Sequence, residues 1–286
     1  MSSTTQKPLY IITGATDAMG SVITQKLAEA GHAIVMACYD DEKCRAKAKE
    51  LTIRTLNKDI TPMHLDLGSF AKVREFVRNI KALNRPVAVL VNNAGYISHR
   101  SEKSPDGFEK LVQVNFLSTS LLSLLMYPLM IDGGRIIFST SLSHTPVSIP
   151  YEFPAVNNFM PIAAYAQSKM ALSLFSIYLS TVLRTHQVSV NSVDCGLINL
   201  SKLSMNRFFS RFSFFSTHTG NLENGARTMM RAIGSADTGF IFKSGNKQIK
   251  ASSLLRNREV FIKLCNDTMR LLKTQLEDPQ NKHRLQ

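Results

Sequence analysis

The order of apolar and amphipathic segments constrains the fold of this chain more than any other feature of its sequence. In residues 1–200, short continuous apolar runs alternate with longer segments of helical spacing, such as Met19–Ala30 and Phe70–Leu83. Continuous runs are typical of strands that helices cover on both faces. Because parallel strands need a crossover between them, this order predicts an α/β fold with an open, doubly wound parallel sheet. The predicted strands are Leu9–Thr13, Ala33–Ala37, Met63–Leu65, Val87–Asn92, Arg135–Ser139 and Val188–Val193.

The last third of the chain is predicted to extend the same domain. Its apolar patterns indicate helices around Met205–Phe209 and Glu223–Ile233, a strand at Gly239–Phe242, and a final helix from about Arg258 to Leu276. No linker, repeat or low-complexity tract separates these residues from the rest. We therefore expect one domain over residues 1–286, with a core in 6–200 and an extension in 201–286.

Composition excludes several classes of protein. The 286 residues include four scattered cysteines, without a CxxC pair or zinc-ligand spacing, so neither a disulfide scaffold nor a zinc module is expected. Residues 1–7 do not resemble a signal peptide. The longest apolar stretch, about Leu117 to Ile131, is shorter than the roughly 20 residues of a membrane span. These features predict a soluble cytoplasmic protein with structural thiols and no metal.

A glycine-containing turn follows the first predicted strand and leads into a helix. It reads Thr13-Gly14-Ala15-Thr16-Asp17-Ala18-Met19-Gly20. Such a turn directs backbone N–H groups and the positive end of a helix dipole toward a pyrophosphate. Asp66 and the segment Asn92–Gly95 follow two other strands, at the carboxyl edge where such sheets bind ligands. Taken alone, Asp66 is explained equally well as a helix N-cap and Asn93–Gly95 as a turn.

Tyr165 and Lys169 lie four residues apart in a segment of helical pattern, Ile162–Leu183, so their side chains share one face. A phenol has a pKa of about 10, and a nearby cation lowers it. The pair can therefore exchange a proton with an alcohol or a carbonyl. Ser141, just after a strand, can hydrogen-bond the same oxygen. Ser143 is the alternative to Ser141, and we interpret His144 as a loop-packing residue rather than a base.

In order and spacing, these motifs resemble the short-chain dehydrogenase/reductase family over essentially the whole chain. The resemblance implies a single-domain Rossmann-type fold and is greatest to the retinol-dehydrogenase-like branch. Features shared with that branch are Ser139–His144, the long interval from Ser141 to Tyr165, and Gly239–Gly245. The family motifs are carried by Thr13, Gly14, Ala18, Gly20, Asp66, Asn92, Asn93, Ala94, Gly95, Asn115, Ser141, Tyr165 and Lys169.

The resemblance implies a role for each motif. Tyr165 would be the general acid/base, Lys169 its tuner, Ser141 the donor to the substrate oxygen, and Asn115 the holder of a water that links Lys169 to solvent. NAD or NADP would lie along the carboxyl edge of the sheet, with residues 194–199 around the nicotinamide amide. The implied cofactor-binding residues are Thr13, Gly14, Asp17, Met19, Gly20, Tyr39, Asp66, Asn93, Ala94, Gly95, Tyr165, Lys169, Gly196 and Ile198.

The residues after the second predicted strand leave the choice between NAD and NADP open. In dinucleotide-binding folds an acid there binds the ribose 2′-OH, and a nearby Arg accommodates a 2′-phosphate. In this chain Cys38 stands where the family has the acid, and Tyr39 where it has the arginine. Charges of both signs lie near these positions: Asp17, Asp40, Lys43 and Arg45.

The formal net charge of +13 is concentrated in the extension, where residues 201–286 carry 15 Lys and Arg against 6 Asp and Glu. These cations are dispersed and no nucleic-acid-binding motif occurs, so we expect a solvated face and no nucleic-acid partner. Five phenylalanines lie in Ser204–Thr217. By resemblance this segment is a lid over an apolar substrate. The alternatives are a filler beneath the C-terminal helices and a membrane-surface contact.

The function expected from these features is NAD(P)-dependent interconversion of an alcohol and a carbonyl on an apolar, retinoid- or steroid-like substrate. The alternative is a dinucleotide-binding sensor of the same fold that performs no chemistry. Only the departures from the family pattern at Ala18, Cys195 and Asn199 favour it. The apolar helices Asn115–Leu129 and Ile162–Leu183 could pair between the subunits of a homodimer or homotetramer.

Overall fold

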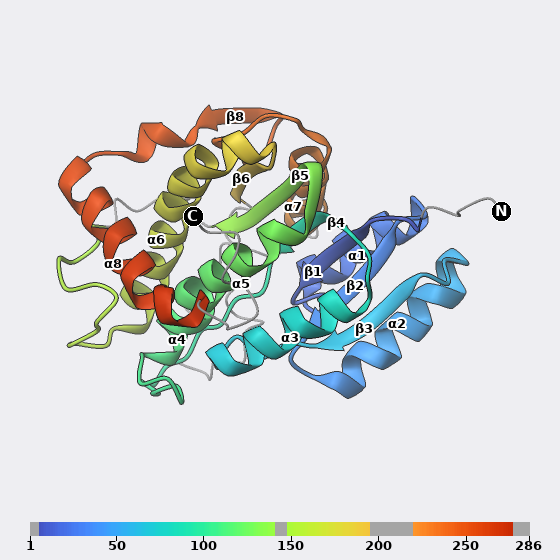
Figure 1. Ribbon diagram of the computed structural model, residues 1–286, viewed down its shortest axis with the longest axis horizontal. Helices are drawn as coiled ribbons and strands as arrows, with labels where there is room; N and C mark the ends of the chain where they lie inside the picture. The colour runs from blue at the N-terminus through green and yellow to red at the C-terminus, as the bar shows by residue number, and fades with distance from the viewer. Residues whose placement is uncertain (1–5, 141–147, 195–219, 277–286) are drawn as a thin grey trace.

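A computed structural model describes residues 6–140, 148–194 and 220–276, which form one eight-stranded sheet between two layers of helices (Figure 1). The strand order is β3-β2-β1-β4-β5-β6-β7-β8. All neighbouring pairs are parallel except β7 and β8. The predicted doubly wound sheet is therefore confirmed. The strands are β1 (Leu9–Thr13), β2 (Ala33–Cys38), β3 (Ile60–His64), β4 (Val87–Asn92), β5 (Met130–Thr140), β6 (Ser189–Asp194), β7 (Phe240–Lys243) and β8 (Lys247–Lys250).

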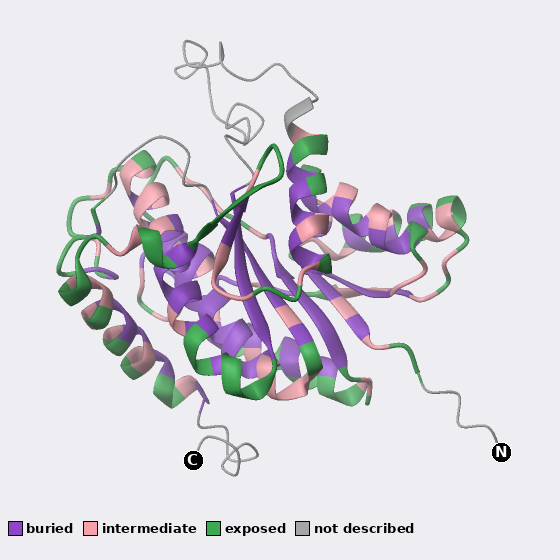
Figure 2. Ribbon diagram, turned by 90° about the horizontal axis from the view of Figure 1, so that it is seen from above, coloured by how far each residue is buried: buried purple, intermediate pink, exposed green. Residues whose placement is uncertain are grey.

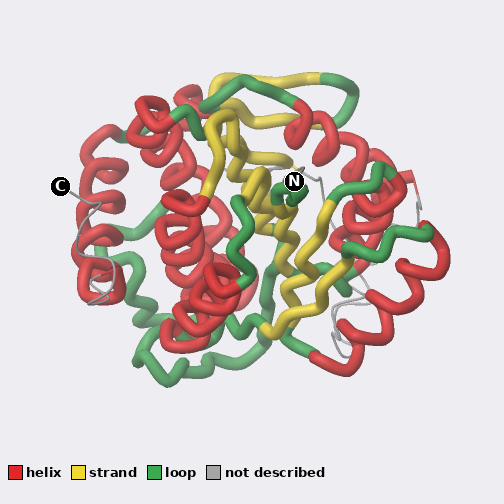
Figure 3. Tube along the Cα trace, turned by 45° about the vertical axis from the view of Figure 1, so that its right-hand side comes forward, coloured by secondary structure: helices red, strands yellow, loops and turns green. Residues whose placement is uncertain are grey.

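Helices cover both faces of the sheet (Figure 3). One face is covered by α1 (Ala18–Glu29), α2 (Asp41–Thr55) and α7 (Gly220–Gly234). The other is covered by α3 (Phe70–Ala82), α4 (Lys110–Val112), α5 (Ser118–Met126), α6 (Pro161–Val182) and α8 (Arg258–Leu276). The strands β2, β4 and β6 are buried at every residue, as expected for strands that helices cover on both faces (Figure 2).

The expectation that the cysteines are free structural thiols is wrong for two of them. Cys38, the last residue of β2, forms a disulfide with Cys44 in the first turn of α2, with the two Cα atoms 6.0 Å apart. The connection between the two elements is tight, because the Asp40 carboxylate caps α2 by accepting from the Lys43 N–H. The side chains of Cys38 and Cys44 therefore point toward each other. Cys265 is a free, buried thiol, and burial raises its pKa to about 12.

The apolar helix around Asn115 is longer than its sequence indicated. Through a π-helical turn, Gln113–Leu117, it joins α4 to α5, and Lys110–Leu129 has the length and apolar character needed to cross a membrane. However, 83% of its most apolar window is buried inside the fold. All nine residues of α5 are buried, and α3 and α8 of the same chain pack on this helix. Its α5 part is therefore enclosed within the chain and not free to pair with a second subunit.

Candidate active site

The turn between β1 and α1 packs closely against the carboxyl edge of the sheet. Gly14 has a φ of +62°, a left-handed conformation that favours glycine. Its N–H donates to the carbonyl of Ala37 in β2 at 2.9 Å, which fixes the turn against the sheet. A Cβ at Gly14 would lie only 2.9 Å from the Cα of Ala94. The turn can therefore take its place only with a glycine here.

Gly20, on the first turn of α1, is expected not to tolerate a side chain. A Cβ built there would overlap the carbonyl oxygen of Gly14 and lie 2.8 Å from the Asn93 amide nitrogen. We predict that Gly20→Ala lowers the free energy of unfolding by about 1–3 kcal/mol, the usual cost of overpacking. Chemical denaturation measures this. The control is Gly234→Ala in α7, where a Cβ meets no atom within 4 Å; equal losses in the two variants would contradict the prediction.

Thr13 ties the turn to the end of β4. Its hydroxyl accepts hydrogen bonds from the backbone N–H groups of Asn93 and Ala94, both at 3.0 Å, and donates to the carbonyl of Val91 at 3.4 Å. The Asn93 amide donates in return to the carbonyls of Thr13 and Gly14. The two predicted segments, the glycine turn and Asn92–Gly95, are thus held together by one hydroxyl and one amide.

Replacing Thr13 by valine should lower the free energy of unfolding by about 1–3 kcal/mol. The change keeps the shape of the side chain but leaves the buried N–H of Asn93 and the partly buried N–H of Ala94 without an acceptor, and an unsatisfied buried donor costs that amount. Thr13→Ser keeps the hydroxyl and serves as the control. Equilibrium unfolding in urea measures both variants, and a serine variant as unstable as the valine variant would argue against this role of the hydroxyl.

Tyr165 and Lys169 project from the first turns of α6, as their spacing predicted. Lys169 is buried, and its ammonium donates to the carbonyl of Ser139 near the end of β5 at 3.1 Å. The same ammonium lies 5.8 Å from the centre of the Tyr165 ring. Tyr165 itself is half-buried, so its ring remains partly open to solvent. The buried Lys169 ammonium therefore lies beside the partly exposed phenol of Tyr165.

Asn115 lies in the π-helical turn and is fully buried. Its amide oxygen accepts from the Tyr96 N–H at 2.7 Å, and its amide nitrogen donates to the Tyr96 carbonyl at 2.8 Å and to the Ser168 hydroxyl at 3.2 Å. Ser168 donates in turn to the carbonyl of Tyr165 at 2.7 Å. Asn115 therefore links the loop after β4 to the helix that carries Tyr165 and Lys169.

Gly95 marks the point where these groups converge. A Cβ at this position would lie 3.6 Å from the Lys169 ammonium and 3.8 Å from the Asn115 amide oxygen. Two further groups take part in this arrangement: the Ser168 hydroxyl, which binds Asn115, and the Ser139 carbonyl, which binds Lys169. The sequence analysis predicted neither of them. Ser168 could have been found from its place between Tyr165 and Lys169. The carbonyl could not, because a backbone acceptor leaves no signal in the side chains.

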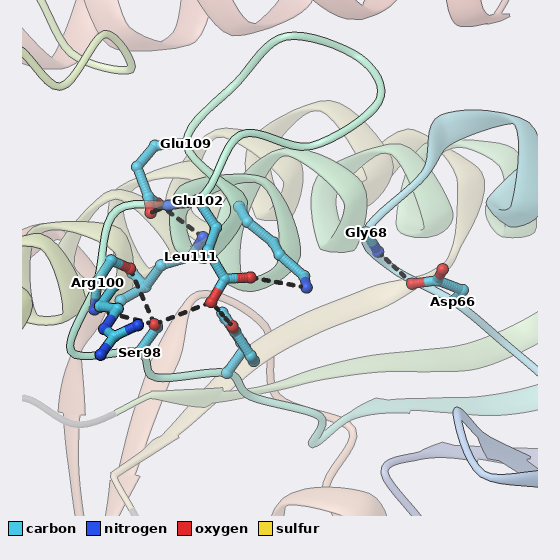
Figure 4. Close-up of polar contacts among 9 residues, drawn as sticks. Asp66, Gly68, Ser98, Arg100, Glu102, Glu109 and Leu111 are labelled. Carbon is cyan, nitrogen blue, oxygen red and sulfur yellow. Dashed lines mark hydrogen bonds and ion pairs between the residues drawn. The ribbon is translucent and has the colours of Figure 1, made fainter.

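The loop that follows Gly95 is braced by Glu102 (Figure 4). The Glu102 carboxylate accepts from the hydroxyls of Tyr96 and Ser98 at 3.1 and 3.2 Å and forms an ion pair with Lys110 at 3.1 Å. The hydrogen bond from the Lys110 ammonium, with those from the hydroxyls, lowers the pKa of Glu102. The Lys110 ammonium also lies 5.2 Å from the centre of the Tyr96 ring. Asn115 therefore fixes the backbone of Tyr96, and Glu102 fixes its hydroxyl.

Asp66 lies just beyond β3, and its carboxylate accepts from the Gly68 N–H at 2.7 Å (Figure 4). The alternative interpretation of Asp66 as a helix N-cap is wrong, because Ser69 occupies the N-cap position of α3 and Asp106 accepts from the Phe70 N–H. Asp66 instead stabilises a local turn.

The remaining predicted cofactor residues differ in how they face solvent. The Met19 side chain is buried in the core, so only its backbone is available to a ligand. Tyr39 is 72% exposed, with its ring 6.1 Å from that of His64. Asp17 occupies the N-cap position of α1, but its side chain makes no capping hydrogen bond. The residue as a whole is exposed, while partial burial of its carboxyl raises the pKa of that group. Ser141, Ser143, His144, Gly196, Ile198 and Ser204–Thr217 lie outside the described residues.

A model of the short chain dehydrogenase family matches residues 9–209, which include the glycine turn, Asn115, Tyr165 and Lys169. The chain belongs to this family. The match covers more than half of the chain and contains every motif on which the resemblance rested except Gly239–Gly245.

Relatives within the family include retinol and polyprenol dehydrogenases. Retinol dehydrogenase 13 of Homo sapiens is 38% identical over 193 residues, covering 65% of this chain and 58% of its own length. Polyprenol dehydrogenase of Homo sapiens is 32% identical and is covered over 60% of its length. The chain therefore spans about three fifths of these two relatives. Retinol dehydrogenase 12 of Mus musculus is 28% identical over 94% of this chain and 87% of its own length.

Solved structures share the fold. A protein of undescribed function from Mycobacterium paratuberculosis matches with a TM-score of 0.75 and 23% identity over 94% of each chain. A metagenomic short-chain oxidoreductase in complex with NADP matches with a TM-score of 0.61 and 25% identity, covering 84% of this chain and 97% of that one.

Proposed function

We propose that this chain is an NAD(P)-dependent oxidoreductase that interconverts an alcohol and a carbonyl on an apolar substrate. The observation that carries the proposal is the convergence of Lys169 and Asn115 on Gly95 at the carboxyl edge of a parallel sheet, with the Tyr165 ring beside the Lys169 ammonium. In open α/β sheets ligands bind at this edge, where the strand order reverses. Here it reverses between β1 and β4, the two strands that Thr13 ties together.

The residues present fit a dinucleotide. At Gly14 and Gly20 the turn packs so closely on itself and on Asn93 and Ala94 that no Cβ fits, and it leads directly into the N-terminus of α1, the arrangement that pyrophosphate binding requires. Gly95 keeps the space beside Lys169 open. When bound there, the nicotinamide would accept or supply the hydride. Gly14 and Gly20 would hold the pyrophosphate, Asp66 would meet the adenine, and Asn93, Ala94 and Gly95 would surround the ribose on the adenine side.

The protein's own part in the reaction is to move a proton. During reduction Tyr165 donates its phenolic proton to the carbonyl oxygen, and during oxidation it takes the proton from the alcohol. The buried Lys169 ammonium favours the phenolate form, because an opposite charge nearby stabilises an anion. Lys169 also anchors the cofactor ribose in this proposal. Ser141 hydrogen-bonds the substrate oxygen as charge develops on it.

Asn115 positions the proton path in this proposal. Its amide fixes the Tyr96 backbone and the Ser168 hydroxyl, and so keeps the loop after β4 at a set distance from α6. A water held beside this amide would connect the Lys169 ammonium to solvent and restore the proton after each turnover.

The proposed substrate is a hydrophobic alcohol or its carbonyl partner, of retinoid, polyprenoid or steroid type. Support comes from the names of the relatives and from the phenylalanine-rich segment Ser204–Thr217, which would cover an apolar ligand.

The proposal is tested by nucleotide binding followed by turnover. Fluorescence titration with NADH and NADPH should show saturable binding of at least one of them. A panel of retinal, a polyprenal, steroid ketones and small polar ketones should then show cofactor oxidation with an apolar member. Binding without turnover on the whole panel would favour a sensor that performs no chemistry. Absence of binding by both nucleotides would overturn the proposal.

A further inference from the structure

Three segments form the rim on which the adenosine ribose of a dinucleotide would rest. They are the β1–α1 turn, the β2–α2 connection and the residues that end β3. The Gly14 N–H donates to the carbonyl of Ala37, and the Leu65 N–H donates to the carbonyl of Cys38 at 2.8 Å. The ends of β1, β2 and β3 are therefore adjacent in space, and the side chains that follow them share one patch of surface.

Neither position that ordinarily selects the ribose substituent carries a charge. Cys38, where an acid would bind a 2′-OH, is 1% exposed and turned into the disulfide with Cys44. Tyr39, where an arginine would bind a 2′-phosphate, is 72% exposed and supplies no cation. The selection must therefore come from the other groups of the rim.

The charges that the described residues place on this rim are mostly negative. Among the described residues of this rim, four carboxylates lie near two permanent cations and the imidazole of His64. The carboxylates are Asp17, Asp40, Asp41 and Asp66, and the cations are Lys43 and Arg45. The hydrogen bond from the Lys43 backbone N–H lowers the pKa of Asp40, so this carboxylate stays ionised at neutral pH.

Both cations are already paired with carboxylates of the same rim. The Lys43 ammonium lies 3.2 Å from the Asp40 carboxylate, and the Arg45 guanidinium lies 3.7 Å from that of Asp41. Asp41 also lies 3.4 Å from the imidazole of His64. Lys110, the next ammonium toward Tyr39, is bound to Glu102.

We propose that this chain binds NAD in preference to NADP, because the acidic rim around Tyr39 repels a 2′-phosphate and the cations that the described residues place there are already paired. The inference rests on the proposed function and deepens it. A 2′-hydroxyl, by contrast, can donate to a carboxylate such as that of Asp40 or Asp41. The rim therefore favours the hydroxyl and disfavours the phosphate.

Rearrangement of the exposed side chains does not remove the repulsion. Lys43 and Arg45 are 77% and 71% exposed, so each can swing toward an incoming phosphate at small cost. Each then leaves behind an unpaired carboxylate, and the net charge of the rim is unchanged. A dianionic phosphate still enters an anionic field, whichever partner it takes.

The test is equilibrium binding of NADH and NADPH to the full chain, followed by nucleotide fluorescence at low ionic strength. NADPH should bind at least about tenfold more weakly than NADH, the ratio that 1.4 kcal/mol corresponds to. Raising the salt concentration should narrow this ratio, because screening weakens repulsion between exposed charges. A site that held the 2′-phosphate with cations would lose NADPH affinity with salt instead, so the direction of the salt effect tests the proposal without any variant.

Two substitutions test the residues. Tyr39→Arg combined with Asp41→Asn should shift the ratio of NADPH to NADH affinity about tenfold or more toward NADPH. Tyr39→Phe controls for loss of the ring hydroxyl. Glu29→Gln, at the far end of α1, controls for the removal of one carboxylate. Equal or tighter binding of NADPH by the unaltered chain would overturn the preference. If neither NADH nor NADPH bound, the proposed function would be contradicted, whereas binding of both with equal affinity would contradict only the preference for NAD.

Discussion

Replacing Tyr165 by phenylalanine should reduce turnover by at least about 10²–10⁴-fold while NADH still binds. Positioned proton transfer contributes a factor of this size, and the variant loses only the phenolic oxygen. The ring stays beside the Lys169 ammonium, so packing at the start of α6 is kept. The measurement is kcat on the substrate found in the panel, together with the NADH dissociation constant.

Tyr178→Phe is the matched control for that experiment. It makes the same chemical change on the same helix, where Tyr178 packs against Phe175 at the side of the core and not beside the Lys169 ammonium. Its kcat should stay within about threefold of the unaltered chain, because surface and packing changes away from reacting atoms have small effects. Unchanged kcat in Tyr165→Phe would exclude Tyr165 as the acid/base. Loss of NADH binding in that variant would show a structural role instead.

Replacing Lys169 by methionine should have the second largest effect, a loss of kcat of about 10²-fold or more. Methionine is unbranched and adaptable and fills the space of the lysine stem. What it removes is a buried cation beside the phenol, and without that cation the phenolate is less stable. The pH at which kcat reaches half its maximum in the oxidation direction should therefore move upward. NADH should also bind more weakly, since Lys169 would anchor its ribose.

The displacement of the pH profile is the diagnostic result for Lys169. A purely structural role would lower kcat at every pH without moving the profile. Lys49→Met, on the exposed side of α2, makes the same change in charge far from the sheet edge and should leave both kcat and profile unchanged. An unshifted profile in Lys169→Met would contradict its role as the group that tunes Tyr165.

Most of the sheet could be predicted from the sequence, because a strand buried on both faces leaves a continuous apolar run. The predicted β1 and β4 have the bounds seen in the structure, β2 is one residue longer than predicted, and β6 is displaced by one residue at both ends. β5 begins at Met130, earlier than predicted, because Asp132-Gly133-Gly134 has the composition of a turn. β8 was missed since all four of its residues are exposed and two are lysines, so no apolar pattern marks it.

In the candidate site, only the relations between residues close in sequence could be predicted. The i, i+4 relation placed Tyr165 and Lys169 on one helix face, and the glycine turn indicated an open backbone at β1. The contacts that assemble the site depend on long-range packing. Neither the π-helical turn at Asn115 nor the pairing of Cys38 with Cys44 has a signature in residue order, because each depends on how two elements meet.

The position of α8 has a practical consequence for experiments with shorter pieces of this chain. The region that matches the family model ends at residue 209, yet α7, β7 and α8 all lie beyond it. The buried faces of α5 and α6 rest on α8, whose Leu264, Leu272 and Leu276 are almost fully covered. A fragment that stopped at the family boundary would present these faces to water and aggregate. We therefore expect that the segment matched by the family model does not fold by itself, and that a fragment meant to stay in solution must include α8 up to Leu276.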